Sequence, residues 1–132
     1  MIFGIGLDLV ELDRIERLRR SRRRFPQRIL TKKELVQYDA LPEKRKTEFL
    51  AGRFVAKEAF AKALGTGIGK EVSFQDIEIG AEPNGRPFFV KPATKRKSHL
   101  SITHTKKYAA AQVILEDKVT FSDSKASVLD NN

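Results

Sequence analysis

The chain has 132 residues and no cysteine, which favours a single domain with a sizeable core and excludes disulfides and thiolate chemistry. Its 26 lysines and arginines outnumber 17 acidic residues, and the net charge of +9 predicts an anionic partner: nucleic acid, a phosphorylated small molecule or an acidic protein. The N-terminal stretch lacks a basic leader and no run is apolar enough to span a membrane, so we expect a cytoplasmic protein.

The first predicted element is a strand over residues 1–10, an apolar run that contains Gly4 and Gly6. Glycines inside a strand indicate close approach of another backbone or of a ligand. Asp8 is out of place in such a run, and two interpretations stay open. Taken alone it fits slightly better as a turn or N-cap residue before the next helix, and the alternative is a carboxylate that holds a cation at the end of a strand.

Residues 11–24 are predicted to form a helix that Phe25–Pro26 ends, because the residue before a proline avoids the helical region. Eight arginines and three acids lie between residues 11 and 28, so this segment carries more than half of the net charge. A run of charge is usually a solvated face. Arginine in such excess is also typical of multidentate contacts with carboxylates or phosphates, and we favour a docking surface.

Two further helices are predicted. Thr31 and Glu34 have the spacing of a capping box, which starts a short helix through Tyr38. After Leu41–Pro42, a long helix is predicted to begin at Pro42 or Glu43 and to end at Leu64.

The long helix is apolar nearly all round, as buried helices are, yet it carries Arg53, Glu58 and Lys62. Arg53 lies between apolar positions and is expected to pair with another group. Glu58 and Lys62 alone fit a surface ion pair worth about 0.3–0.5 kcal/mol, and the alternative is that they line a site. The turn 65–69 is a weak phosphate loop, because it follows a helix, but a reasonable C-cap with backbone open to a ligand.

The rest of the chain is predicted to be β-structure. A strand around Ile77–Ile79, a turn at Asn84–Gly85 and a returning strand over residues 86–90 form a hairpin, and Pro87 indicates an edge or end position. Residues 91–98 are interpreted as a basic loop.

Two more strands follow, over residues 99–105 and 108–115, before a polar tail that we expect to be disordered. His104 falls on the same face as Leu100 and Ile102. A buried, hydrogen-bonded histidine and a functional one are about equally consistent with that position.

Three separated stretches are the basis of a family resemblance: residues 4–11 (GIGLDLVE), 49–69 and 101–105 (SITHT). Their order and spacing along the chain are those of the family. With residues 28–31 and Glu34, they resemble the bacterial holo-acyl-carrier-protein synthases, the small phosphopantetheinyl transferases, over residues 1–116. The resemblance implies an α+β fold, with a long buried helix on a small antiparallel sheet, and a homotrimer with active sites at subunit interfaces. Residues 117–132 form the tail outside this domain.

The same resemblance implies a reaction of fatty acid biosynthesis. The phosphopantetheine arm of coenzyme A passes to a serine of apo acyl carrier protein, and adenosine 3′,5′-bisphosphate is released. Asp8 and Glu58 bind Mg²⁺ with the coenzyme diphosphate, which suits a hard octahedral ion. Glu58, directly or through a metal-bound water, is the candidate base, and Lys62 stabilises the leaving phosphate and is the candidate acid.

The resemblance also assigns binding residues. Those expected along the coenzyme are Gly65, Thr66 and Gly67, with Pro87 and His104 nearby, from the same or a neighbouring subunit. Those expected around the nucleotide 3′-phosphate are Arg45 and Arg53, with Lys44 a weaker candidate. Those expected to dock the acidic carrier protein are Arg14, Leu18, Arg24, Phe25 and Arg28.

Two competing functions remain. A nucleic-acid-binding module would explain a pI of about 10.0 and the basic runs. It lacks interleaved aromatic residues and leaves Asp8, Glu58 and Lys62 without a role. A trimeric coenzyme-A-binding protein without catalysis ranks lower, because all the candidate catalytic residues are present.

Overall fold

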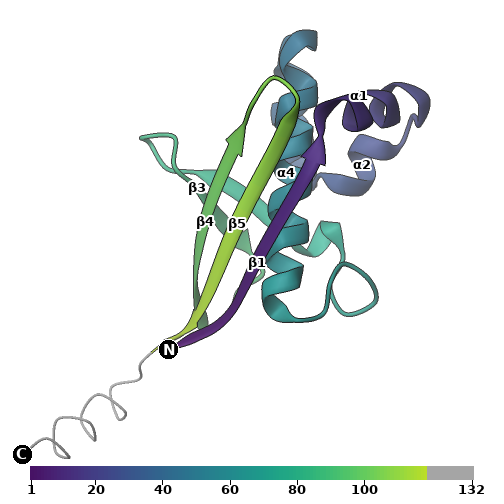
Figure 1. The fold of residues 1–132 in the computed structure, drawn as a ribbon. Coiled ribbons are helices and arrows are strands. Elements are labelled where there is room, and N and C mark those ends of the chain that lie inside the picture. Colours follow the sequence, from purple (N-terminus) through teal and green to yellow (C-terminus); the bar gives the residue numbers. More distant parts are fainter. Residues whose placement is uncertain (119–132) are drawn as a thin grey trace, which may run out of the picture.

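The computed structural model describes residues 1–118, which build two antiparallel sheets around one long helix (Figure 1). The strands are β1 (Ile2–Glu11), β2 (Glu78–Ala81), β3 (Pro87–Lys91), β4 (Arg96–His104) and β5 (Tyr108–Asp117). The helices are α1 (Leu12–Ser21), α2 (Phe25–Ile29), α3 (Lys32–Ala40) and α4 (Glu43–Leu64), and a 3₁₀ turn, η1, spans Phe74–Asp76. Among these residues, no helix is both long and apolar enough to cross a bilayer.

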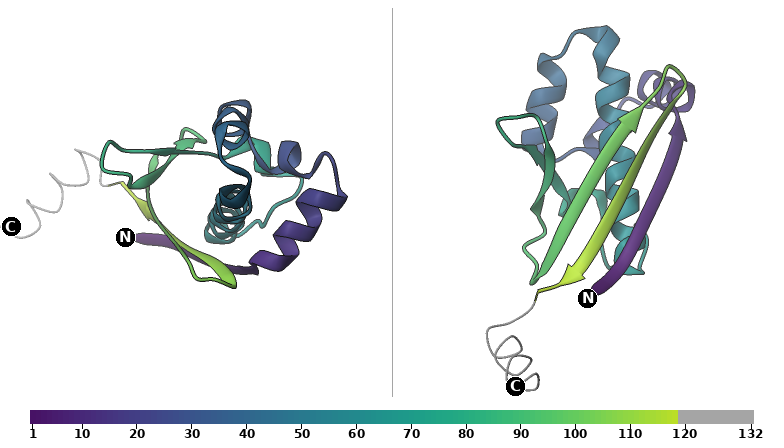
Figure 2. Two further views of the ribbon diagram at one scale, coloured as in Figure 1. Left: turned by 90° about the horizontal axis from the view of Figure 1, so that it is seen from above. Right: turned by 60° about the vertical axis from the view of Figure 1, so that its left-hand side comes forward.

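The larger sheet has the strand order β1-β5-β4, and β2 pairs with β3 in a separate hairpin. Seen from above, the strands curve around α4, with the shorter helices on the opposite side (Figure 2). This arrangement confirms the α+β prediction of a long helix packed on a small antiparallel sheet.

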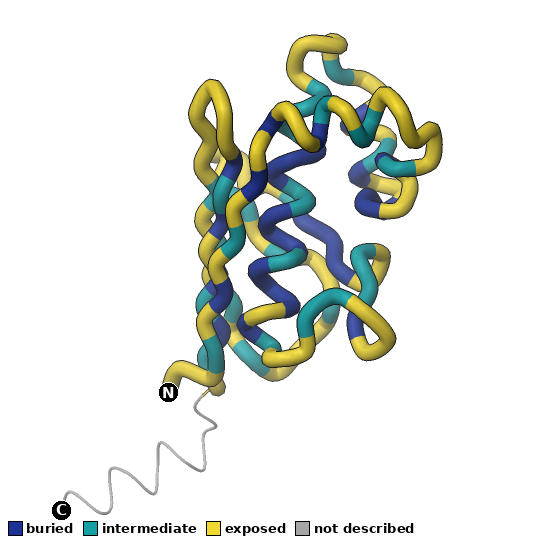
Figure 3. The backbone as a smooth tube through the Cα atoms, turned by 45° about the vertical axis from the view of Figure 1, so that its right-hand side comes forward, coloured by how far each residue is buried: buried dark blue, intermediate teal, exposed yellow. Residues whose placement is uncertain are grey.

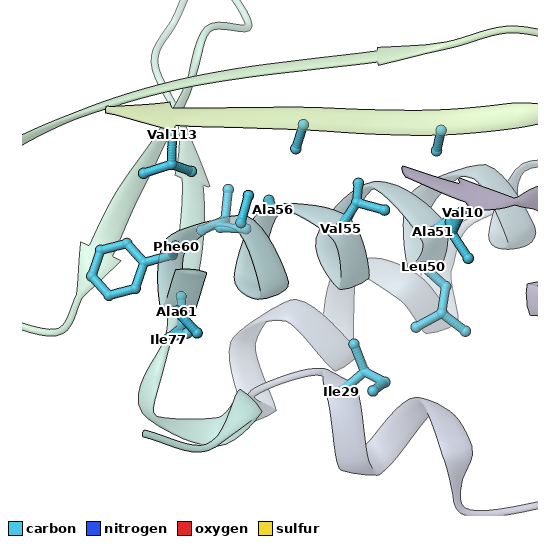
Figure 4. Close-up of a cluster of buried hydrophobic side chains, with 14 of the residues drawn as sticks. Val10, Ile29, Leu50, Ala51, Val55, Ala56, Phe60, Ala61, Ile77 and Val113 are labelled. Carbon is cyan, nitrogen blue, oxygen red and sulfur yellow. The ribbon is translucent and has the colours of Figure 1, made fainter. Parts of the chain in front are cut away.

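Helix α4 is the centre of the core, and it is the most continuously buried part of the backbone (Figure 3). Its side chains pack on both sides: Val55 and Ala56 point toward the larger sheet, and Ala61 lies beside Ile77 on the other side (Figure 4). Leu50, Val55 and Phe60 are buried, as are Val113 on β5 and Ile29 on α2. Burial on several sides explains why the sequence of this helix shows no single apolar stripe.

The predicted caps of α3 and α4 are correct, but Asp8 is not an N-cap: it lies inside β1, and Glu11 precedes α1. Thr31 and Glu34 form the capping box that starts α3. Pro42 precedes α4, and Gly65 ends it in the left-handed conformation with φ 87°. Gly85 also has a positive φ in the turn between β2 and β3.

Some predicted boundaries are wrong. The helix predicted over residues 11–24 ends at Ser21, and Phe25–Pro26 begins α2 instead of ending α1, because a proline fits the first turn of a helix, where no N–H partner is required. The basic loop predicted at 91–98 is shorter, since β3 runs to Lys91 and β4 begins at Arg96. Asp117 closes β5, and the tail from residue 119 lies outside the described residues.

Gly4 and Gly6 mark the tightest contact of the fold. A Cβ atom on Gly6 would lie 1.7 Å from the Ala59 carbonyl oxygen of α4, and one on Gly4 would lie 1.9 Å from that of Ala63. The partner indicated by these glycines is therefore the backbone of α4.

We expect Gly6→Ala to lower the free energy of unfolding by about 3 kcal/mol, because a methyl group there forces β1 away from α4. Urea denaturation followed by circular dichroism measures this loss. Gly69→Ala is the matched control: no atom lies within 4 Å of its added Cβ, so its change should stay within about 0.5 kcal/mol. Equal stability of both variants and the parent would contradict the close contact.

Candidate active site

Two carboxylates and a lysine converge where β1 crosses the C-terminal half of α4. Asp8 follows Gly6 by two residues, so it points from the same face of the strand toward the helix. The Lys62 Nζ atom donates to Asp8 Oδ1 and to the Leu7 carbonyl oxygen, each at 3.1 Å. The ion pair of Lys62 is thus with Asp8, and residues 1–118 contain no Glu58–Lys62 pair.

Glu58 lies in surroundings that disfavour its ionised form. Burial and the nearby charge of Asp8 raise the pKa of Glu58, while Lys62 and Arg14 oppose this shift. Ionised together, the two carboxylates repel each other, and a divalent cation would relieve that repulsion. In the described part of the chain, no three His, Cys, Asp or Glu side chains form a metal-binding group. A pair of carboxylates still fits Mg²⁺, which usually takes its remaining ligands from water and substrate phosphates.

The glycine turn after α4 borders this site but offers few free N–H groups. The Gly65 amide donates to the Lys62 carbonyl, and the amides of Thr66 and Gly67 donate to that of Ala61. These bonds satisfy the last carbonyls of the helix. The predicted C-cap is confirmed, and what the turn presents to a ligand is its exposed outer surface.

A second pocket, of about 190 Å³, lies between α4 and β4 and contains three of the predicted binding residues: Arg45, Arg53 and His104. The guanidinium of Arg53 lies over the Phe49 ring, 4.5 Å from its centroid. His104 is exposed, and its Nδ1 atom lies 3.5 Å from Glu48 Oε1, so it is not the buried histidine that the strand pattern allowed.

Two of the residues predicted to bind the coenzyme, Lys44 and Pro87, line other grooves of the structure. Lys44 lines a separate groove beside Arg19 and Glu43. Pro87 begins β3 and lines a groove of about 490 Å³ with residues of β4 and β5. Neither borders the pocket of Arg45 and Arg53.

The arginine-rich segment divides into paired and unpaired residues. Arg19 and Arg20 form ion pairs with Glu16, and Arg19 also pairs with Glu43. Within residues 1–118, no ion pair holds the three arginines predicted to dock a partner, which are Arg14, Arg24 and Arg28. Arg24, Phe25 and Arg28 line one pocket with Arg22, and Leu18 on α1 is half-buried. These cations are available to an acidic partner.

The sequence model of the 4′-phosphopantetheinyl transferase superfamily matches residues 4–113. The chain belongs to this superfamily. The holo-[acyl-carrier-protein] synthase of Bacillus subtilis (strain 168) is 59% identical over 117 residues, which are 88% of this chain and 97% of that protein.

Solved structures of this transferase superfamily have the same fold. The holo-(acyl-carrier-protein) synthase from Bacillus anthracis str. Ames, in complex with CoA (3′,5′-ADP), is 51% identical, and the match has a TM-score of 0.84 over 89% of this chain and 99% of that one. The Helicobacter pylori holo-[acyl-carrier-protein] synthase in complex with coenzyme A is 35% identical, with a TM-score of 0.72 over 85% and 99%.

The transferase fold also contains a buried polar network that the sequence did not reveal. Lys57 is fully buried and donates to Glu34 Oε1 at 2.6 Å, and Glu78 accepts from Thr31 Oγ1 at 2.6 Å. Burial lowers the pKa of Lys57, and the negative charge of Glu34 opposes this. The sequence does place the charged residue Lys57 on a helix that is otherwise apolar nearly all round. Glu58 and Lys62 are charged residues on the same helix, so this pattern alone could not single out Lys57 as the buried one.

Proposed function

We propose that the chain transfers 4′-phosphopantetheine from coenzyme A to a serine hydroxyl of apo acyl carrier protein, as a holo-[acyl-carrier-protein] synthase of the cytoplasm that serves fatty acid biosynthesis. The observation that carries this proposal is the convergence of Asp8, Glu58 and Lys62 beside the glycine turn. The family match and the activity named for its relatives support it. So does the coenzyme A in two solved relatives.

In this reaction the serine oxygen attacks the phosphorus that carries the pantetheine arm, and the bond from that phosphorus to the oxygen of the 5′-phosphate breaks. Glu58 is the base that takes the serine proton, directly or through an intervening water. Lys62, held by Asp8 and the Leu7 carbonyl, offsets the charge that develops on the leaving 5′-phosphate and can protonate it.

Asp8 and Glu58 are the residues that would hold Mg²⁺. When bound, the ion neutralises charge on the diphosphate and favours in-line geometry. The repulsion between the two carboxylates is what makes their site receptive to a cation.

The pocket of Arg45, Arg53 and His104 receives the nucleotide end of the coenzyme, with the two arginines at its 3′-phosphate. Gly65, Thr66 and Gly67 lie along the diphosphate side, next to Lys62. Lys44, which lines another groove, stays the weaker candidate.

The carrier protein docks on Arg14, Leu18, Arg24, Phe25 and Arg28. Their position suits a protein that must deliver a serine, because the charge of Arg14 acts on Glu58 and so lies close to the reacting groups.

The active unit is a homotrimer with its sites at subunit interfaces. The outward face of β1 exposes Ile5, Leu7 and Leu9, of which Leu7 is 63% and Leu9 62% exposed. Such a row of aliphatic side chains is unusual on a monomer and typical of an interface. A second copy of the chain would cover it and could bring Pro87 of a neighbour to the coenzyme.

The transfer itself is tested by mixing the protein, Mg²⁺, coenzyme A and apo carrier protein, and by measuring the phosphopantetheine mass addition. We expect an addition that EDTA abolishes, and a kcat lowered about 10²–10⁴-fold in Glu58→Gln and Lys62→Ala with both substrates saturating. The exposed pair Glu71→Gln and Lys70→Ala are matched controls with unchanged rates. No addition to a competent carrier would reject the enzyme and favour nucleic-acid or coenzyme binding alone.

For the docking surface, we expect Arg24→Glu to raise KM for the carrier protein about tenfold and to leave KM for coenzyme A unchanged, because only the acidic partner meets that side chain. The difference should shrink with added salt. Arg86→Glu, an exposed reversal on the β2–β3 turn, serves as the control. An unchanged carrier KM in both Arg24→Glu and Arg14→Glu would reject this surface.

For the trimer, Leu7→Glu should convert the assembly to monomers and lower transfer activity, since a carboxylate would be buried in an apolar interface. Light scattering coupled to size-exclusion chromatography measures the mass. Val36→Glu changes an equally exposed aliphatic residue on α3 and should leave the trimer intact. A parent protein that is itself monomeric would contradict the assembly.

A further inference from the structure

Behind the pocket of Arg45 and Arg53 lies a buried charge cluster, of which only Arg53 has a role in the proposed transfer. It consists of Glu34 on α3 and Lys57 on α4, which are 1% and 0% exposed, together with Arg53, whose side chain is 14% exposed. The inference that follows rests on the proposed contact of Arg53 with the 3′-phosphate of coenzyme A.

Lys57 has no donor to spare. Its Nζ atom donates to the Ile29 carbonyl at 2.7 Å, to the Phe74 carbonyl at 3.2 Å and to Glu34 Oε1 at 2.6 Å. These are the three N–H groups of an ammonium, so the lysine holds α2, η1 and Glu34 in one fixed arrangement.

Both oxygens of Glu34 are also engaged. Oε1 accepts from Lys57 and from the Thr31 amide at 2.9 Å, and Oε2 accepts from the Ile79 amide at 2.9 Å. Oε1 therefore has two donors, whereas Oε2 has one and can accept a second, which leaves Glu34 able to pair with a further cation.

Arg53 lies beside this carboxylate without bonding to it. Its Nε atom is 3.7 Å from Glu34 Oε2, beyond hydrogen-bond distance. That Nε is buried, and it has no hydrogen-bond partner in the described part of the chain. Arg53 therefore has a nearby counter-charge but an Nε–H group that no described residue uses.

We propose that Lys57 is a positioning residue for coenzyme selectivity: by bonding to Glu34 Oε1 and sharing the charge of that carboxylate, it keeps Glu34 from closing the 3.7 Å separation to Arg53, so that the Arg53 guanidinium stays available to the 3′-phosphate. Carboxylate and phosphate compete for the same guanidinium, and a bidentate arginine–carboxylate pair is among the stronger ion pairs. Without Lys57, Glu34 loses one of its two neighbouring cations. Its carboxylate would then form a closer ion pair with the other, Arg53. The pocket then loses its contact with the anion.

The test compares kcat/KM for coenzyme A with kcat/KM for 3′-dephospho-coenzyme A in folded variants. We expect Lys57→Met to lower this ratio about tenfold, the size of one charged hydrogen bond. The double variant Lys57→Met/Glu34→Gln should regain most of it, because no carboxylate is left to capture Arg53. A purely structural ion pair would reduce both activities together, so the ratio would stay unchanged in Lys57→Met even where Glu34→Gln restores stability.

Three further variants separate the possible failures. Lys46→Met removes a lysine of the same helix that pairs with Glu43, and it should leave the ratio unchanged. Arg53→Ala should lower the ratio, and adding Lys57→Met to it should lower it no further. An unchanged ratio in Arg53→Ala would reject the phosphate contact itself.

A lowered ratio in Arg53→Ala with an unchanged ratio in Lys57→Met would overturn the role of Lys57 alone. Circular dichroism melting establishes that each variant is folded. Where Lys57→Met is unfolded, Lys57→Gln, which keeps an N–H donor without the charge, takes its place with the same expected and contradicting outcomes.

Discussion

The contact of two glycines of β1 with the backbone of α4 is the constraint on which the rest of the structure depends. Gly4 and Gly6 let the strand touch the carbonyl oxygens of Ala63 and Ala59, a distance that no side chain permits. Because side chains alternate along a strand, this contact fixes which residues point at the helix. Asp8, two positions on, falls within 3.1 Å of Lys62 and close enough to Glu58 to raise its pKa. The packing of the fold thus places the reacting groups.

The features that could be predicted from the sequence depend on interactions between residues close together in the chain. A cap needs one side chain and one amide a few residues apart, so the Thr31–Glu34 box and Gly65 were predictable and are confirmed. The start of α2 was missed because Phe25–Pro26 can end one helix or open another, and only packing decides. The larger role of Glu34 was also hidden, since its partners Lys57 and Ile79 are 23 and 45 residues away. Such contacts depend on the tertiary fold, and no pattern of residue spacing in the sequence predicts them.

The two sides of α4 pack in different ways: one side makes close contact with the larger sheet, and the other makes polar contacts with α2 and η1. Toward the larger sheet, small residues allow close approach: the Ala59 carbonyl meets Gly6 of β1, and Ala56 and Ala59 are fully buried. Toward the smaller helices, Lys57 donates to the Ile29 carbonyl of α2 and to the Phe74 carbonyl of η1. Removing either partner of the buried Lys57–Glu34 pair would leave an unpaired buried charge, which is costly. The intact pair adds little net stability, because burying both charges costs about as much as their attraction returns. Its main effect is therefore to fix the geometry of the core.

The end of α4 also explains why a cation is favoured at this position. Helix carbonyls concentrate negative potential at a C-terminus, and the amides of Gly65, Thr66 and Gly67 offset part of it by bonding to the last carbonyls. Lys62 lies in the last turn, where the helix dipole stabilises a positive charge, but it is already paired with Asp8. Glu58 therefore faces Asp8 with incomplete compensation, and burial makes its ionisation more costly still. A site with this balance gains most from a ligand that brings a divalent cation, because the cation offsets the repulsion between the two carboxylates.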